Sequence, residues 1–234
     1  YGVMFAVPVF VQTFLHFTAT QSGYLLMPGG LASAVMMVAM SKITPRVDAR
    51  LLIACGAMLM VVTAVSLSDI NPDTGTSSLF LPLVLRGIGT VTMFLPLSLA
   101  TLGGLPMADR AAASGFYSLA RQMGSSIGIA AITTFLAQRE AVHRAILVEK
   151  VTLGSHETVA RLNHFTAGFA QRCADPVAAH QQALAALDRI VDGQALLLSF
   201  ADVFFYAGAA FVVTLPLLLL LGQGGKSQAP IIDH

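Results

Sequence analysis

The chain alternates between long apolar stretches and short segments in which the charged residues gather. A helix needs roughly 20 apolar residues to cross about 30 Å of hydrocarbon. Five stretches supply them, and none contains more than one charged residue. They are residues 22–41, 51–68, 78–102, 111–136 and 194–221. The pattern therefore predicts five membrane-spanning helices.

A sixth apolar run opens the chain at residues 1–15. At about 1.5 Å per residue it reaches only about 22 Å, which is short of a bilayer. The first residue is Tyr1 rather than methionine, and no charged signal-peptide start precedes it. We therefore interpret this run as the end of a span that begins upstream, which makes six spans of a longer chain.

Composition agrees with a membrane protein. Hydrophobic residues make up 56% of the chain and charged residues 11%, and the mean hydropathy is +0.76, which is outside the range of soluble domains. The net charge is +1. No basic face or recognition motif is present, so nucleic acid is not an expected partner.

Lysine and arginine in the short loops predict the orientation, because cytoplasmic loops are enriched in them. The loops at 16–21 and 69–77 have neither. The opposite loops and the tail carry Lys42, Arg46, Arg50, Arg110 and Lys226. The side with these basic residues, which includes the C-terminus, is therefore predicted to be cytoplasmic.

The predicted divisions of the chain are spans one to five at 1–136, an extracytoplasmic helical loop at 137–193, the last span at 194–222 and a tail at 223–234.

The outer loop contains two amphipathic runs, and Asp175 before Pro176 is a helix-start signal for the second, which could continue into the last span. These helices either cover the outer mouth or dock a partner.

The outer loop also holds His143, His156, His164 and His180. Their spacing has no i, i+4 pair and no cysteine motif accompanies them, so we expect solvated histidines and no metal site. Cys55 and Cys173 are expected to be free thiols.

Three charged residues fall inside the predicted spans: Arg86, Arg121 and Asp202. Each costs at least about 2.5–3.5 kcal/mol near the bilayer centre, so such residues face the bundle interior and pair or line a watery path. Arg121 either lines a polar cavity or bonds helix-end carbonyls. Arg86 and Asp202 lie at similar depth and are predicted to form a coupling or structural ion pair.

Small residues lie near both arginines. Such residues allow helix backbones to approach closely in lipid, so they predict tight helix packing. They are Ala120, Gly124 and Gly128 beside Arg121, and Gly87 and Gly89 beside Arg86. The sequence shows no pairing of nucleophile and base, zinc-binding helix or paired-carboxylate site, so an enzyme is not expected.

Four segments together carry a resemblance to a known family. They are "ATQSGYLLMPGGLAS" (19–33), "LRGIGTVTMFLPLSLA" (85–100), "ADRAAASGFYSLA" (108–120) and "RQMGSSIGIA" (121–130). They resemble the C-terminal half of the fourteen-span drug:proton antiporters of the EmrB/QacA type, in the major facilitator superfamily. The resemblance implies an all-α integral membrane fold, with six helices forming the C-terminal bundle and an outer helical loop before the last span. Spans one, two, four and five would face a central cavity.

The resemblance also implies a function: proton-coupled multidrug efflux of amphiphilic compounds by alternating access, in a bacterial inner membrane. The proton gradient would replace any cofactor, and the proton-carrying carboxylates would lie in the missing N-terminal half. Implied partners are membrane lipid and, on the outer side, a periplasmic adaptor protein and an outer-membrane channel. The alternative is a major facilitator transporter for a defined metabolite or nutrient. The predicted substrate-cavity residues are Arg121, Gln122, Phe116, Tyr117, Met93, Phe94 and Gln12.

Overall fold

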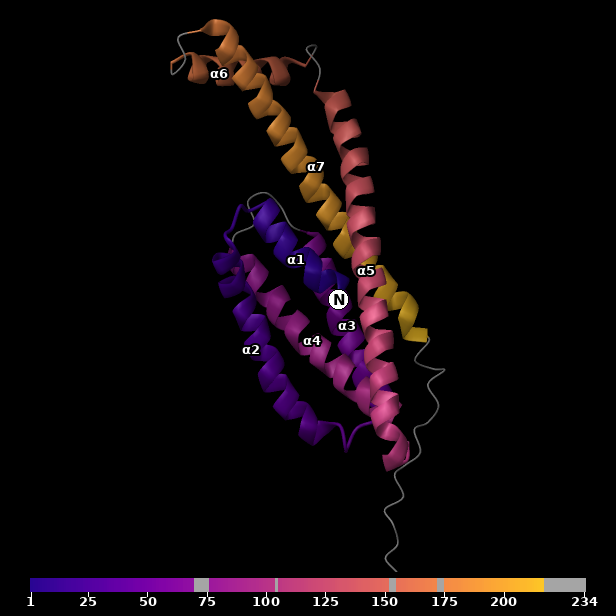
Figure 1. Ribbon diagram of the computed structural model, residues 1–234. Coiled ribbons are helices and arrows are strands. Elements are labelled where there is room, and N and C mark those ends of the chain that lie inside the picture. Colours follow the sequence, from indigo (N-terminus) through magenta and orange to yellow (C-terminus); the bar gives the residue numbers. More distant parts are fainter. Residues whose placement is uncertain (70–75, 104, 152–154, 172–174, 217–234) are drawn as a thin grey trace, which may run out of the picture. The chain divides into compact units, whose positions relative to one another are not determined.

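The chain is an all-α integral membrane protein. The computed structural model describes residues 1–69, 76–103, 105–151, 155–171 and 175–216, and within these ranges seven helices account for the regular structure (Figure 1). Their bounds are α1 Gly2–Thr13, α2 Ala19–Ile43, α3 Ala49–Ser68, α4 Thr76–Leu102, α5 Met107–Lys150, α6 His156–Ala170 and α7 Pro176–Thr214. The end of the predicted last span, the tail at 223–234 and Cys173 lie outside the described residues.

Side chains at the helix starts bond to the backbone N–H groups that the first turn leaves without partners. Thr18 and Gln21 form a capping box at the start of α2. Asp48 accepts a hydrogen bond from the Arg50 N–H at the start of α3, at 3.0 Å. Asp175 does the same for the Val177 N–H at 3.0 Å, which confirms the helix start predicted there. Local chemistry therefore fixes where these helices begin.

Four of the described helices are long and apolar enough to cross a membrane: Ala19–Ile43, Ala49–Ser68, Ser78–Leu102 and Pro176–Thr214. They overlap four of the predicted spans, and the last of them does so over residues 194–214. The helix at Gly2–Thr13 is apolar but shorter. The span predicted at 111–136 lies in α5, where Arg121 and Gln122 lower the hydropathy, and it stays a prediction together with the opening one.

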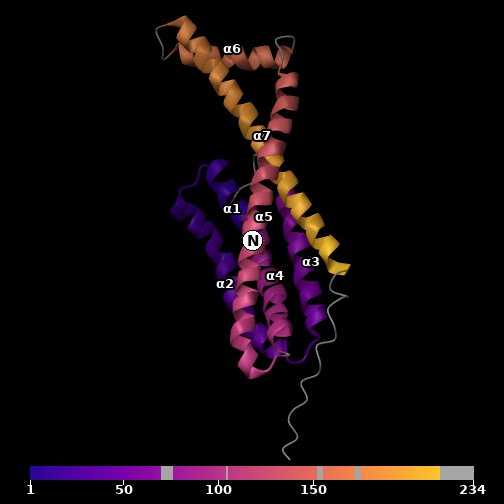
Figure 2. The same ribbon diagram turned by 45° about the vertical axis from the view of Figure 1, so that its right-hand side comes forward.

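Two compact units divide the chain: residues 1–130 with 204 onward, and residues 131–203. In the first unit, α4 packs against α2 and against α3 (Figures 1 and 2). Glycines allow these contacts. An added Cβ at Gly29 would lie 2.6 Å from the Leu83 carbonyl oxygen, and one at Gly56 would lie 2.6 Å from the Met93 backbone nitrogen. The helix backbones therefore meet without intervening side chains.

The predicted packing glycines differ in their surroundings. A Cβ at Gly87 would collide with the Gly29 carbonyl oxygen of α2, and one at Gly89 would lie 3.1 Å from the Leu59 Cβ of α3. At Gly124 and Gly128 of α5, a Cβ would meet no atom within 4 Å. Gly87 and Gly89 thus serve close packing within the described unit, whereas the contact predicted for Ala120, Gly124 and Gly128 stays a prediction.

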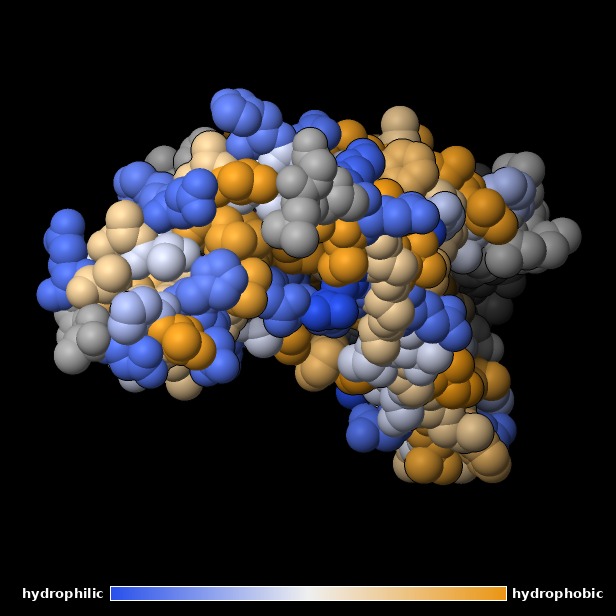
Figure 3. All heavy atoms as spheres, turned by 90° about the horizontal axis from the view of Figure 1, so that it is seen from above, coloured by the Kyte–Doolittle hydropathy of each residue, from blue (hydrophilic) through white to orange (hydrophobic). Residues whose placement is uncertain are grey.

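The second unit holds α6 and the parts of α5 and α7 that lie within 131–203. The predicted divisions at 136/137 and 193/194 fall inside α5 and α7, which continue through them. The expectation that the second outer helix runs into the last span is confirmed by α7. The face seen in Figure 3 mixes hydrophilic and hydrophobic side chains.

Replacing Gly87 with alanine is expected to destabilise the full-length protein. The methyl group would overpack the α2–α4 contact, at a cost of about 1–3 kcal/mol in unfolding free energy, which lowers the melting temperature. The measurement is thermal unfolding in detergent. The matched control is Gly30→Ala on α2, where the added Cβ meets nothing within 4 Å. Equal melting temperatures for the two variants would contradict the packing described here.

Candidate functional site

Two aromatic residues from α4 and α5 form the centre of the candidate site in the first unit. The rings of Phe94 and Tyr117 lie edge to face, with centroids 6.4 Å apart and planes at 62°. The Tyr117 hydroxyl lies 2.8 Å from the Ser98 hydroxyl. Ser98 donates its single hydrogen to the Phe94 carbonyl oxygen at 2.9 Å, so Tyr117 is the donor to Ser98. One hydrogen bond and one ring contact thereby fix the aromatic pair.

Arg121 lies one helical turn after Tyr117 on α5 and extends over the same cluster. Its guanidinium carbon is 5.4 Å from the centroid of the Phe94 ring. A cation over an aromatic face is stabilised by about 0.5–1 kcal/mol at an exposed site and by about 2 kcal/mol or more when water is excluded. Arg121 is exposed in the described structure. The predicted cavity residues Phe94, Tyr117 and Arg121 are therefore brought together with one open face.

The remaining predicted cavity residues lie elsewhere. Met93 lies on the α3 side of α4, where its backbone contacts Gly56. Phe116 is 75% exposed, and Gln122 and Gln12 are exposed as well, Gln12 on α1. Sequence reasoning missed Ser98. Its position four residues after Phe94 was the available signal, because residues at i and i+4 share a helix face.

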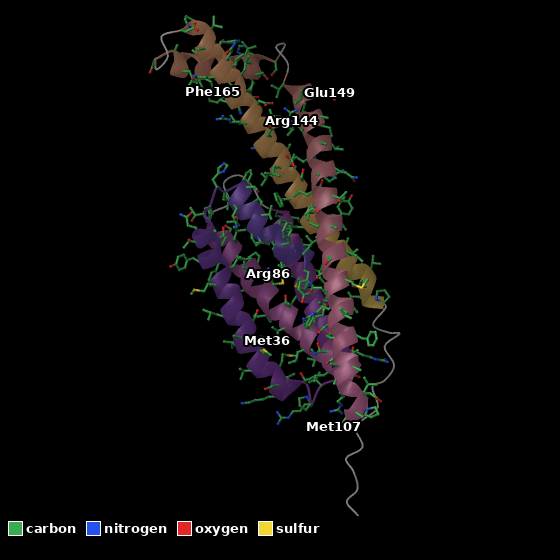
Figure 4. All side chains as sticks on the ribbon, in the orientation of Figure 1. Met36, Arg86, Met107, Arg144, Glu149 and Phe165 are labelled. Carbon is green, nitrogen blue, oxygen red and sulfur yellow. The ribbon has the colours of Figure 1, made fainter. Side chains whose placement is uncertain are left out.

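Arg86 is the most deeply buried charged residue in the described part of the chain, at 8% exposed. It lies on α4 (Figure 4), two helical turns before Phe94. Its Nε atom is buried and has no hydrogen-bond partner among the described residues. An unpaired buried charge is costly, so this guanidinium has unused capacity to bind an acceptor.

Within the second unit, Asp202 has two partners on α5. Its Oδ2 atom accepts a hydrogen bond from Arg139 Nε at 2.6 Å and lies 2.7 Å from His143 Nε2. Arg86 belongs to the first unit, so its predicted pairing with Asp202 stays a prediction. The expectation that His143 is solvated is wrong, since its side chain is only 17% exposed. Arg139 and His143 are four residues apart on α5. That spacing places them on one helix face and was the signal available in the sequence.

A second, exposed group of ion pairs joins α5 to α7. Arg144 (Figure 4) donates from Nε to Asp192 at 2.5 Å and from Nη2 to Asp188 at 2.8 Å. The hydrogen bond and charge of Asp192, followed by the charge of Asp188, raise the pKa of Arg144. Exposed pairs of this kind contribute little stability.

The long apolar helices define an integral membrane protein. Residues 1–129 match the family model of the Major Facilitator Superfamily. Because that match covers more than half of the chain, the chain belongs to this superfamily.

Several curated relatives of the chain are named as exporters or resistance proteins. The colistin resistance protein EmrB of Acinetobacter baumannii is 26% identical over 97% of this chain and 44% of its own length. The multidrug export protein EmrB of Escherichia coli K12 is 26% identical over 96% of this chain and 43% of its own length. The fatty acid resistance protein FarB of Neisseria gonorrhoeae is 24% identical over 94% of this chain and 42% of its own length. The chain thus spans less than half the length of these relatives.

The Tyr117–Ser98 hydrogen bond is expected to stabilise the α4–α5 contact. Tyr117→Phe and Ser98→Ala should each lower the unfolding free energy of the full-length protein by about 0.5–1.5 kcal/mol. The double variant should lose little more than either single variant, because both remove the same bond. Thermal unfolding in detergent measures all three. Fully additive losses would show that the two hydroxyls do not act on each other.

Proposed function

We propose that this chain forms the C-terminal half of a proton-coupled multidrug efflux transporter that exports amphiphilic compounds by alternating access. The half-length coverage of the exporter relatives and the match to the Major Facilitator Superfamily support this proposal. The transporter lies in a bacterial inner membrane, with the C-terminus of this chain on the cytoplasmic side. The N-terminal half supplies the second bundle and the carboxylates that carry protons.

The observation that carries the proposal is the cluster of Phe94, Tyr117 and Arg121. Aromatic rings provide a large apolar contact without demanding one ligand shape. A guanidinium beside them attracts the negative or polar end of an amphiphile and stacks on planar groups. The Ser98 bond and the helix backbones fix the cluster, while its side chains keep an open face. A site of this kind selects amphiphilic molecules as a class.

Arg86 supplies a second positive group on α4. A buried guanidinium without an acceptor is stabilised when a carboxylate approaches it. In the proposed cycle, a carboxylate of the N-terminal half is held by Arg86 while ionised and is released when protonated. Proton binding then changes how the two halves contact each other, as alternating access requires.

Replacing Arg121 with alanine in the full-length protein is expected to abolish drug resistance without preventing membrane insertion. The variant loses the cation over the Phe94 ring, and export of ethidium from whole cells should fall about tenfold or more, equivalent to about 1.4 kcal/mol. Arg121→Lys keeps the charge and should retain part of the activity. The measurements are growth in the presence of drug, fluorescence of retained ethidium and the amount of protein in the membrane.

The control is Arg189→Ala, which removes an exposed arginine from α7 and should leave resistance unchanged. If the Arg121→Ala variant conferred the same drug resistance as wild type, Arg121 would have only a structural role. A full-length protein that moves a single metabolite and confers no resistance to any dye or drug would instead favour the metabolite transporter.

A further inference from the structure

The carboxylate of Asp202 is shared by two donors of different chemistry. Arg139 Nε lies 2.6 Å from Asp202 Oδ2, and His143 Nε2 lies 2.7 Å from the same oxygen. The three side chains are partly buried, at 32% exposed for Arg139, 17% for His143 and 26% for Asp202. Arginine stays protonated at every physiological pH, whereas histidine changes charge between about pH 5 and 8. The cluster therefore contains one fixed charge and one that can change.

The geometry also identifies the atom that takes up the proton. An ionised carboxylate offers only acceptors, so the imidazole nitrogen that faces it carries a hydrogen. His143 thus holds its Nε2–H toward Asp202 in both charge states, and Nδ1 is the atom that gains or loses a proton. When Nδ1 is neutral, the charges of Arg139 and Asp202 cancel. When Nδ1 binds a proton, the cluster carries one net positive charge.

Several other charged groups of this unit have partners of their own. On α7, Asp188 and Asp192 bond to Arg144, and Asp192 lies ten residues, or about 15 Å, from Asp202 along the helix. On α6, Glu157 and Arg161 pair with each other at 3.0 Å. The charges that face Asp202 in the described structure are therefore those of Arg139 and His143, both on α5.

We propose that His143 and Asp202, with Arg139 as the fixed countercharge, form a proton-binding site that links α5 to α7 in the outer part of the protein. Uptake of a proton at His143 Nδ1 converts a neutral cluster into a cationic one and strengthens its bond to Asp202. Loss of the proton weakens that bond. The site lets the transporter respond to the pH on its outer side, and this role in transport rests on the proposed function.

The transport test uses the full-length protein in everted vesicles, with ethidium as the probe. The pH of the lumen, which faces the outer side, is varied from 6 to 8, and the pH outside the vesicles is changed by the same amount, so that the proton gradient that drives export stays constant. The wild-type rate is expected to change about fivefold or more over this range, and the His143→Gln rate by less than about twofold. Glutamine keeps an amide donor for Asp202, so the contact between helices persists. The matched control is Arg144→Gln, which breaks an exposed α5–α7 ion pair and should keep the wild-type pH profile. A wild-type profile in His143→Gln would overturn the proposal.

A second measurement reads the proton at His143 without transport. Diethyl pyrocarbonate modifies neutral imidazole only, and mass spectrometry of the detergent-solubilised full-length protein gives the rate at His143. Asp202→Asn removes the negative charge that stabilises imidazolium. The modification rate at pH 6 is expressed relative to the plateau rate at pH 8.5. This relative rate should be about threefold or more higher in Asp202→Asn than in wild type.

The two measurements separate the two proposals. If wild type moves no ethidium but Asp202→Asn alters the modification profile, the multidrug function fails and the proton-binding site stands. Identical modification profiles in wild type and Asp202→Asn would overturn the site, whether or not the protein exports drugs. Melting temperatures of both variants in detergent show whether each one folds.

Discussion

A lipid bilayer offers no hydrogen bonds, and this constraint governs every polar side chain in the spans. Buried hydroxyls are satisfied by their own helices: Thr63 bonds to the Leu59 carbonyl oxygen, and Ser199 to that of Ala195. Asp202 bonds to two donors on α5. The Nε of Arg86 stands apart, since it is buried without an acceptor among the described residues. In the proposed transporter, this nitrogen is the group that is free to bind a carboxylate.

Close backbone contact of α4 with α2 and α3 orients the aromatic cluster. Glycines let α4 approach α2 and α3 until backbone atoms meet, which leaves little freedom to rotate α4 about its axis. The remaining face of α4 carries Phe94 and Ser98, and both contact Tyr117 on α5. The glycines thus act on function indirectly, because they determine which side chains α4 presents to α5. In a membrane, where apolar side chains gain nothing by leaving lipid for protein, such packing is a principal source of helix association.

Some of the site could be predicted from spacing along one helix. Tyr117 and Arg121 are four residues apart, so any helix over this region places them on one face. The same rule would have grouped Arg139 with His143. Spacing could not show that Phe94 faces Tyr117 while its neighbour Met93 faces Gly56. Depth in the membrane could not identify the partner of Asp202 either. Two residues at the same depth can face different neighbours, because depth does not determine how each helix is rotated or which helices lie beside it.

The sequence by itself determined that the protein is helical and membrane-spanning, where several helices begin, and that it resembles a family of drug exporters. The helical, membrane-spanning character and the helix starts depend on apolar content and on capping bonds between residues a few positions apart. The resemblance depends on short motifs. All of these are local features of the chain. Only the tertiary structure decided that Asp202 binds Arg139 and His143 and that Ser98 joins the aromatic cluster. It also decided that the Nε of Arg86 is buried without an acceptor among the described residues. Each of these depends on how helices distant in sequence approach and rotate, and that choice is made by backbone packing across the bundle.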